Sequence, residues 1–203
     1  MTEIKILYDK IYSENLNRDP KHFIDLYDEN KNLIEGADPS TSNPDYDGIM
    51  RITSEYALSL SHYGSSRKAI PYLDKSIQLF KDRSVDDLTK VPMYEMLVWT
   101  RGVEHYNNKN YKTASQDFQY LVYTYPDNDK YRNWLLASKT IKAKKYLNYI
   151  WGFAFMSFIW YSLATKDGDT NRDYFLMATG VFVLIGILVE IANSILKSSI
   201  KQK

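Results

Sequence analysis

The last third of the chain holds two long apolar stretches on either side of a short charged loop. Residues 146–164 carry no formal charge, and residues 174–196 carry only that of Glu190. As α-helices with a rise of about 1.5 Å per residue, they would be ~28 and ~34 Å long, enough to cross a hydrocarbon core of about 30 Å. A core helix of a soluble fold keeps a polar stripe toward water, and neither stretch has one. The sequence therefore predicts a transmembrane hairpin over residues 146–196.

Basic residues flank this hairpin on one side. The only basic residues in the connecting loop are Lys166 and Arg172. The lysines that precede the first stretch or follow the second are Lys139, Lys142, Lys144, Lys145, Lys197, Lys201 and Lys203. By the positive-inside rule both termini should be cytoplasmic, with residues 197–203 as a cytoplasmic tail and residues 165–173 outside. The first residues contain no apolar signal sequence that would export the domain before the hairpin.

Composition limits the location and the partners of the chain. The formal net charge of +1 argues against a nucleic-acid partner, because such proteins need a basic surface. There is no cysteine, which is consistent with a reducing compartment. The abundance of Tyr, Asn, Lys and Ile is typical of an AT-rich genome. We therefore expect an integral protein of a bacterial inner membrane, in contact with the lipid bilayer.

Helical periodicity dominates the chain before the hairpin. Apolar residues recur every three or four positions over residues 4–12, as on one face of a helix. A second helix, with Asp19 as its N-cap and Pro20 in its first turn, is expected to end before Gly36. The segment 1–36 is thus predicted to form a helical hairpin. The next segment, residues 37–48, is rich in Asp, Pro, Ser, Thr and Asn and predicts a loop.

Beyond this loop the chain repeats a helix–turn–helix pattern. The second unit has a small residue in its first helix, an aromatic residue before the turn, an alanine early in the second helix, a large residue four positions later and a closing proline. Its pattern residues are Gly102, Tyr106, Tyr111, Ala114, Phe118 and Pro126. The first unit is less complete, with Ala57, Ala69 and Leu73 at matching positions and no closing proline.

This pattern resembles the tetratricopeptide repeat over about residues 50–145. The resemblance implies helical hairpins that cross at the small residues, where a larger side chain would push the helices apart. Ala69 precedes Ala114 by 45 residues rather than the usual 34, which implies a longer loop between the units, with one turn capped by Ser84. A helix over residues 128–145 is expected to cap the stack and continue into the first span.

The predicted fold is therefore all-α. A tetratricopeptide-repeat-like stack of helical hairpins over residues 49–145, completed by residues 1–36, is followed by a two-helix transmembrane hairpin. Its spans are 146–164 and 174–196.

The resemblance also implies a concave groove that can hold a partner peptide or helix. In the second unit the groove positions are Met96, Trp99, Val103 and Tyr106, with Asn107 next to them. In the first unit they are Arg51, Ser54, Leu58 and Ser61. The surface is mostly apolar and aromatic, and it lacks the lysine and asparagine pattern with which chaperone-binding members hold a terminal carboxylate. In the alternative interpretation, Trp99 and Tyr106 pack against residues 1–36 of the same domain.

The residue patterns of the common enzyme classes are missing from the sequence. It contains no glycine-rich phosphate loop, no His-Glu-x-x-His and no Gly-x-Ser-x-Gly. The three histidines, His22, His62 and His105, stand alone on separate predicted helices, where a structural role is expected. We therefore expect no catalysis, no cofactor and no metal site.

Glu190 is the one ionisable residue within a predicted span. An intramembrane carboxylate is costly and indicates function, here with Asn193 and Ser194 on nearly the same face. In the alternative, non-functional interpretation, the Glu190 side chain reaches the cytoplasmic headgroups, since Lys197 follows it by about 10 Å of helical rise.

Three functional hypotheses follow. The leading one is a non-enzymatic, membrane-anchored adaptor that recruits or assembles a protein partner at the membrane. The second is a homo-oligomeric membrane effector or small channel, in which several hairpins line a pore around Glu190. The third is a scaffold subunit of a transport or secretion complex.

Overall fold

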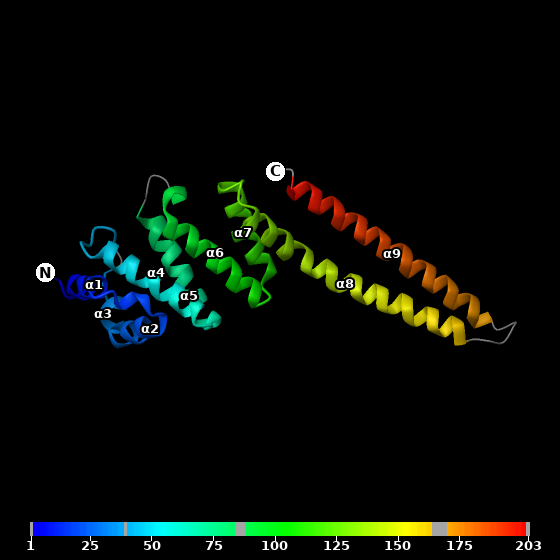
Figure 1. The fold of residues 1–203 in the computed structure, drawn as a ribbon, viewed down its shortest axis with the longest axis horizontal. Helices are drawn as coiled ribbons and strands as arrows, with labels where there is room; N and C mark the ends of the chain where they lie inside the picture. Colours follow the sequence, from blue (N-terminus) through cyan, green and yellow to red (C-terminus); the bar gives the residue numbers. More distant parts are fainter. Residues whose placement is uncertain (1, 39, 84–87, 164–169, 202–203) are drawn as a thin grey trace. The chain divides into compact units, whose positions relative to one another are not determined.

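In the computed structural model the described part of the chain consists of helices joined by turns and loops, with no strand there (Figure 1). The described residues are 2–38, 40–83, 88–163 and 170–201. They confirm the all-α fold class. The chain divides into two compact units, residues 1–131 and 132–203. The predicted cap at Ser84 and most of the predicted outside loop lie beyond the described residues.

Three short helices open the first unit. They are α1 (Glu3–Ser13), α2 (Pro20–Glu29) and α3 (Lys31–Glu35), with a 3-10 turn, η1 (Leu16–Arg18), after α1. Asp19 accepts a hydrogen bond of 2.9 Å from the backbone N–H of Lys21, which confirms it as the N-cap of α2. The single helix expected up to Gly36 is interrupted at Asn30. The side chain of Asn30 donates to the carbonyl oxygen of Leu26 at 2.9 Å, and such local bonds compete with the helical pattern.

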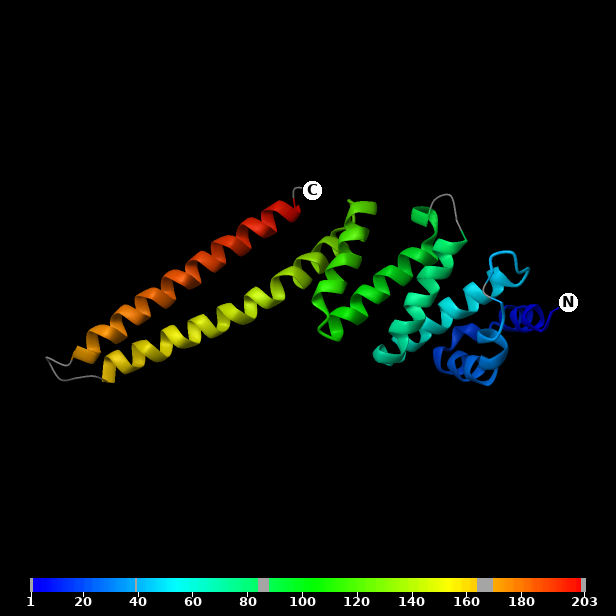
Figure 2. The ribbon, with the colours of Figure 1, turned by 180° about the vertical axis from the view of Figure 1, so that it is seen from behind.

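Two helical hairpins form the body of the first unit (Figures 1 and 2). They are α4 (Tyr46–His62) with α5 (Ser66–Asp82), and α6 (Pro92–Asn107) with α7 (Tyr111–Thr124); a 3-10 turn, η2 (Leu88–Lys90), precedes α6. The first hairpin begins inside the segment 37–48 that we predicted as a loop. Tyr46 is buried there, and its hydroxyl donates to the carbonyl oxygen of Leu79 in α5 at 2.6 Å. This contact extends α4 toward its amino end.

The same turn closes both hairpins. Gly64 has a φ of 81° and Lys109, 45 residues later, has a φ of 64°. In each turn the N–H of the next residue donates to the carbonyl oxygen five residues earlier, at 2.9 and 2.8 Å. A left-handed residue combined with this bond is the Schellman ending of a helix. The backbone therefore repeats with the 45-residue period that the sequence shows.

Small residues lie where the helices of each hairpin cross. Ala57, Ala69 and Ala114 have no exposed surface. At Gly102, an added Cβ atom would stand 2.8 Å from Cε1 of Phe118, a ring that is itself fully buried. Since Gly102 lies within a regular helix, packing rather than backbone conformation requires glycine here.

Stacked tyrosines bind the amino-terminal helices to the first hairpin. The rings of Tyr27 in α2 and Tyr56 in α4 are 3.7 Å apart and nearly parallel, and Tyr72 of α5 meets both edge-on. The Tyr56 hydroxyl donates to Asp28 at 2.8 Å, and the Tyr72 hydroxyl donates to Glu35 at 2.9 Å. Such aromatic pairs contribute about 0.5–1.5 kcal/mol beyond their buried area. The first three helices therefore share one core with the hairpins.

The second unit is a pair of long antiparallel helices (Figures 1 and 2). α8 (Asp129–Leu163) begins at the end of the first unit, and α9 (Thr170–Lys201) returns beside it. Their register is set by ring pairs between Phe153 and Phe182 and between Trp160 and Phe175, and by a 2.9 Å hydrogen bond between Ser157 and Thr179. The prediction that a helix over residues 128–145 continues into the first apolar stretch is confirmed by α8.

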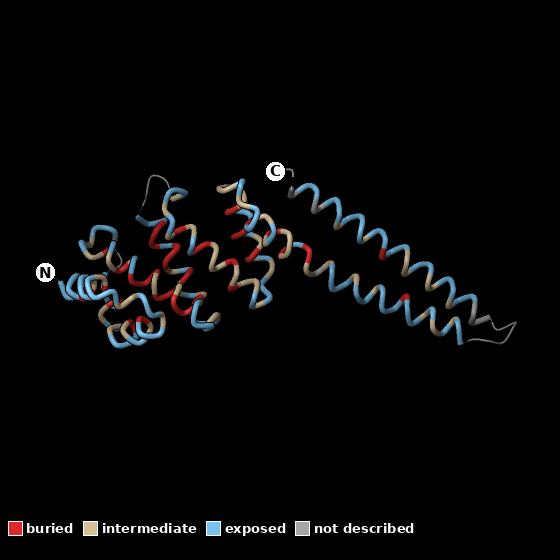
Figure 3. Tube along the Cα trace, in the orientation of Figure 1, coloured by how far each residue is buried: buried red, intermediate tan, exposed pale blue. Residues whose placement is uncertain are grey.

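Large apolar side chains are mostly exposed on this second unit and mostly buried in the first (Figure 3). Among the described residues one helical segment, Asp173–Ile195, is long and apolar enough to cross a membrane. Residues 146–163 have a lower mean hydropathy than a spanning helix needs, because their tyrosines, tryptophans and Asn148 are less apolar than aliphatic side chains. Length and composition thus support one span.

Replacing Gly102 by alanine should destabilise the protein, although alanine is the better helix former. The new methyl group would press on the buried Phe118 ring, and overpacking costs about 1–3 kcal/mol. We expect the full chain in detergent to melt several degrees lower by circular dichroism. Gly48→Ala is the matched control, because its Cβ atom would meet Tyr8 at an ordinary 3.5 Å. An unchanged melting temperature for Gly102→Ala would contradict the close crossing.

Candidate functional site

A charged cluster ties three helices of the first unit together. Arg101 of α6 forms a bidentate pair with Asp117 of α7, with N–O distances of 2.5 and 3.0 Å. The same guanidinium reaches Asp74 of α5 at 2.8 Å. The Asp117 side chain is 6 % exposed, whereas that of Asp74 is 53 % exposed. Most of the energy of the cluster therefore depends on the buried pair, because an exposed ion pair is screened by water.

Burial raises the pKa of the Asp117 carboxyl, and the adjacent Arg101 guanidinium opposes that rise. His105, one turn farther along α6, also acts to lower this pKa. The Arg101 guanidinium thus stabilises the negative charge of Asp117 in the interior. Because this pair joins α6 to α7, it also fixes the rotation of α6 about its own axis. That rotation decides which side chains of α6 face the neighbouring helix α4.

A cavity of about 310 Å³ opens on the α4 and α6 side of the first unit. It is lined by Pro20, Leu58, Ser59, Ser61, His62, Met96 and Thr100. Leu58, Ser61 and Met96 belong to the groove that the sequence predicts, and the structure brings them together. Met96 is 46 % exposed, so its apolar side chain is open to solvent. The cavity is apolar at Leu58 and Met96 and carries hydroxyl groups around them.

Behind the cavity lies a buried carboxylate. Glu104 of α6 is 3 % exposed, and one of its oxygens accepts a short hydrogen bond from the Ser61 hydroxyl. The other oxygen, Oε2, has no hydrogen-bond partner among the described residues. Because the Ser61 proton is committed to Glu104, the Ser61 oxygen is left as a hydrogen-bond acceptor at the cavity wall.

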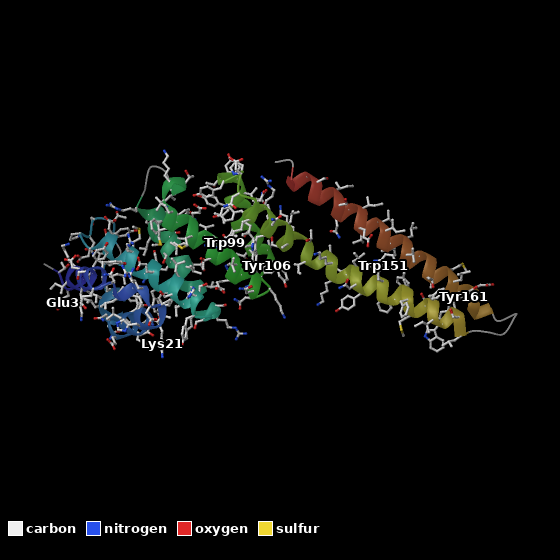
Figure 4. All side chains as sticks on the ribbon, viewed as in Figure 1. Glu3, Lys21, Trp99, Tyr106, Trp151 and Tyr161 are labelled. Carbon is white, nitrogen blue, oxygen red and sulfur yellow. The ribbon has the colours of Figure 1, made fainter. Side chains whose placement is uncertain are left out.

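Trp99 and Tyr106 are two further predicted groove residues of α6, both labelled in Figure 4. The Trp99 ring is 5.5 Å from Phe118 and 5.2 Å from Tyr131, and the Lys130 ammonium lies 4.0 Å from its centre. These ring contacts are with α7 and the start of α8. Trp99 does not line the cavity of Leu58 and Met96, and neither interpretation of the sequence considered its contacts with α7 and α8. A wider groove that includes Trp99 stays a prediction.

Tyr106 follows Trp99 by seven residues and shares its face of α6. Its ring is 5.3 Å from that of Tyr111, the first residue of α7, so it packs at the turn of the second hairpin. Pro126, the last residue of the repeat pattern, is exposed just after α7.

The other predicted groove residues are dispersed. Val103 is half-buried and Asn107 is exposed at the end of α6. Arg51 forms an ion pair within α4 at 3.1 Å and lies 5.1 Å from the centre of the Tyr12 ring. Ser54 has no exposed surface and donates to a carbonyl oxygen one turn earlier. Arg51 and Ser54 are thus held by contacts inside the first unit.

Four residues that line the cavity were not predicted from the sequence: Pro20, Ser59, His62 and Thr100. Thr100 follows Met96 by four residues and so lies on the same helix face, a spacing that could have identified it. Pro20 belongs to α2, and only the packing of α2 on α4 brings it to the cavity.

The second unit has its own cavity, of about 330 Å³, between α8 and α9. It is lined by Thr140, Lys144, Leu147, Glu190, Asn193 and Ser194. The structure thus brings together the predicted intramembrane polar residues Glu190 and Asn193. It adds Lys144 from the other helix of the pair.

Within the described ranges, no group of three or more His, Cys, Asp or Glu side chains is placed to hold a metal ion. His62 lines the cavity of the first unit, His105 lies near Asp117, and His22 is exposed in α2.

Comparison with protein-family models, with curated proteins and with solved structures gives no match. The candidate functional features are therefore the two cavities described above and the exposed helices of the second unit.

Removing the Arg101 charge should leave Asp117 buried without a partner. We expect Arg101→Met to lower the free energy of unfolding by about 3–5 kcal/mol near neutral pH. Asp74→Asn, which breaks only the exposed contact, should cost less than about 1 kcal/mol. Thermal melts of the full chain in detergent measure both. A double variant, Arg101→Met with Asp117→Leu, should recover most of the loss.

The loss in Arg101→Met should also depend on pH. Without the guanidinium, the pKa of Asp117 in the folded state rises further above its value in the unfolded state. At a pH between these two pKa values, the folded state binds a proton that the unfolded state lacks. Stability of the variant relative to the parent therefore increases as pH falls through the folded pKa. A pH-independent difference would show that Asp117 is not buried as a charge.

Proposed function

We propose that this chain is a membrane-anchored, non-enzymatic adaptor, in which a tetratricopeptide-repeat-like domain binds a protein partner and a two-span hairpin anchors it. The observation that carries the proposal is the cavity between α4 and α6. It offers exposed apolar surface at Met96 and an acceptor at Ser61. These are features of a peptide-binding surface.

The lining of this cavity favours an uncharged, apolar segment of the partner. Leu58 and Met96 provide dispersion contacts, and the unbranched methionine side chain adapts to different shapes. Ser61 can accept a hydrogen bond from a backbone N–H of the segment, a donor that a peptide presents regularly. We therefore propose that one or two large apolar side chains enter the cavity while a neighbouring N–H binds Ser61.

The exposed apolar surface of the second unit supports the anchor. Asp173–Ile195 has the length and composition of a span. Residues 146–163 pair with it in antiparallel register and carry tyrosines and tryptophans near their ends, as spanning helices do at the headgroups. We propose that both helices cross the inner membrane of a bacterium, with the termini and the first unit in the cytoplasm.

The position of Glu190 favours an anchor over a pore. Glu190 shares its cavity with Lys144, which precedes the apolar part of α8. A carboxylate at the lysine-rich end of the hairpin lies near the headgroups in this topology, where its charge is hydrated.

The binding surface can be tested in intact cells with a photo-cross-linking residue at position 96. We expect one discrete protein adduct from Met96 and none of the same mass from Tyr123, an 89 % exposed aromatic on α7. The identified partner, once purified, should bind Met96→Glu at least tenfold more weakly than the parent, because a charge enters an apolar contact. Equal adducts from both positions, or unchanged affinity, would exclude this surface.

The topology can be tested with single cysteines, since the chain has none of its own. An impermeant thiol reagent should label Asp173→Cys in intact cells and Ser13→Cys only after the membrane is opened. Both positions are exposed in the structure. Labelling of Ser13→Cys in intact cells would reverse the orientation.

A further inference from the structure

The register of the second unit places two opposite charges around one cavity. Phe153 pairs with Phe182, and closer to the chain ends an added Cβ atom at Gly186 would stand 3.2 Å from the Trp151 ring. The same antiparallel register continued toward the ends brings Lys144 of α8 opposite the α9 residues around Glu190. The cavity of about 330 Å³ opens just beyond the close contact at Gly186.

Most polar side chains of this cavity form no polar contact with the described residues. Lys144 and Glu190 line it together, yet no ion pair or hydrogen bond joins either of them to any described residue. The side chains of Asn193 and Ser194 likewise form no hydrogen bond in the described part of the chain. The Thr140 hydroxyl donates to a carbonyl oxygen one turn earlier at 2.8 Å, so its oxygen remains an acceptor.

The chemistry of the cavity points to a ligand that carries both charges. A simple anion would pair with Lys144 but be repelled by the Glu190 carboxylate. A simple cation would pair with Glu190 but be repelled by the Lys144 ammonium. A zwitterion satisfies both groups at once. In the proposed anchor this cavity lies at the cytoplasmic headgroup level, since Lys144 comes just before the apolar part of α8.

We infer that the cavity between α8 and α9 binds a phosphoethanolamine lipid headgroup, with its ammonium at Glu190 and its phosphate at Lys144. This inference rests on the proposed membrane anchor. The ammonium has three N–H donors for the Glu190 carboxylate and for the acceptors of Asn193 and Thr140. The phosphate oxygens accept from Lys144 and Ser194, and charge-assisted bonds of this kind are the stronger ones.

The headgroup of a phosphocholine lipid is the matched control ligand. It has the same phosphate and the same net charge, but its three methyl groups remove every N–H donor. The full chain should be reconstituted in vesicles with equal amounts of phosphatidylethanolamine, phosphatidylcholine and phosphatidylglycerol of identical acyl chains. Native mass spectrometry after gentle extraction then counts the lipids that stay bound. We expect phosphatidylethanolamine to be retained about tenfold over each of the other two.

Single substitutions test whether the preference for phosphatidylethanolamine depends on the cavity between α8 and α9. Glu190→Gln and Lys144→Gln should each reduce the preference to less than about threefold. Lys145→Gln removes a neighbouring lysine that does not line the cavity, and Asp173→Asn removes an acid at the other end of α9. Both should keep the parent preference. A loss in Lys145→Gln equal to that in Lys144→Gln would indicate general surface charge and overturn the inference.

The outcomes separate the cavity from the anchor. If the parent chain is extracted from membranes by alkaline carbonate, the proposed anchor fails and the inference fails with it. If the chain stays embedded but retains the three lipids equally, the headgroup site is excluded and the anchor stands. Equal retention of phosphatidylglycerol and phosphatidylethanolamine would mean that phosphate alone is bound, and it would also overturn the inference. The parent comparison needs no variant, so it decides the question even if a variant fails to insert.

Discussion

The arrangement of the first unit depends on the pairing of Arg101 with the buried carboxylate of Asp117. A charge in a protein interior is tolerated only with a partner in good geometry, and this pair joins α6 to α7 while Asp74 extends it to α5. Three positions farther along α6, Glu104 bonds to Ser61 of α4. The two polar contacts fix the rotation of α6 on both sides, and that rotation turns Met96 toward the cavity.

The two units differ in how far their apolar side chains are buried. The first unit buries its apolar residues and admits close helix crossings only where the side chain is as small as Gly102 or Ala114. The second unit exposes most of its apolar residues, as expected of the membrane anchor that we propose. The hydrogen bond between Ser157 and Thr179 lies on the faces of α8 and α9 that meet.

Agreement between sequence and structure is greatest where a residue acts locally. The cap at Asp19 uses a backbone N–H two residues away, and the crossing at Gly102 needs only a small side chain within a repeated pattern. The break at Asn30 was missed because the side chain could equally have pointed to solvent within a continuous helix. The ring contacts of Trp99 with Phe118 and Tyr131 were not predicted, because a spacing along the chain does not specify how a helix is rotated against its neighbours.

The amino-acid sequence by itself determined the helical character, the repeated turns and the long apolar stretch over Asp173–Ile195, since these follow from periodicity, composition and backbone preference. Only the tertiary structure decided which distant residues share a site. The cavity of Leu58 and Met96 and the cavity of Lys144 and Glu190 each join side chains from different helices. Such encounters depend on helix rotation and register, which are set by the summed packing of many side chains and not by spacing along the chain.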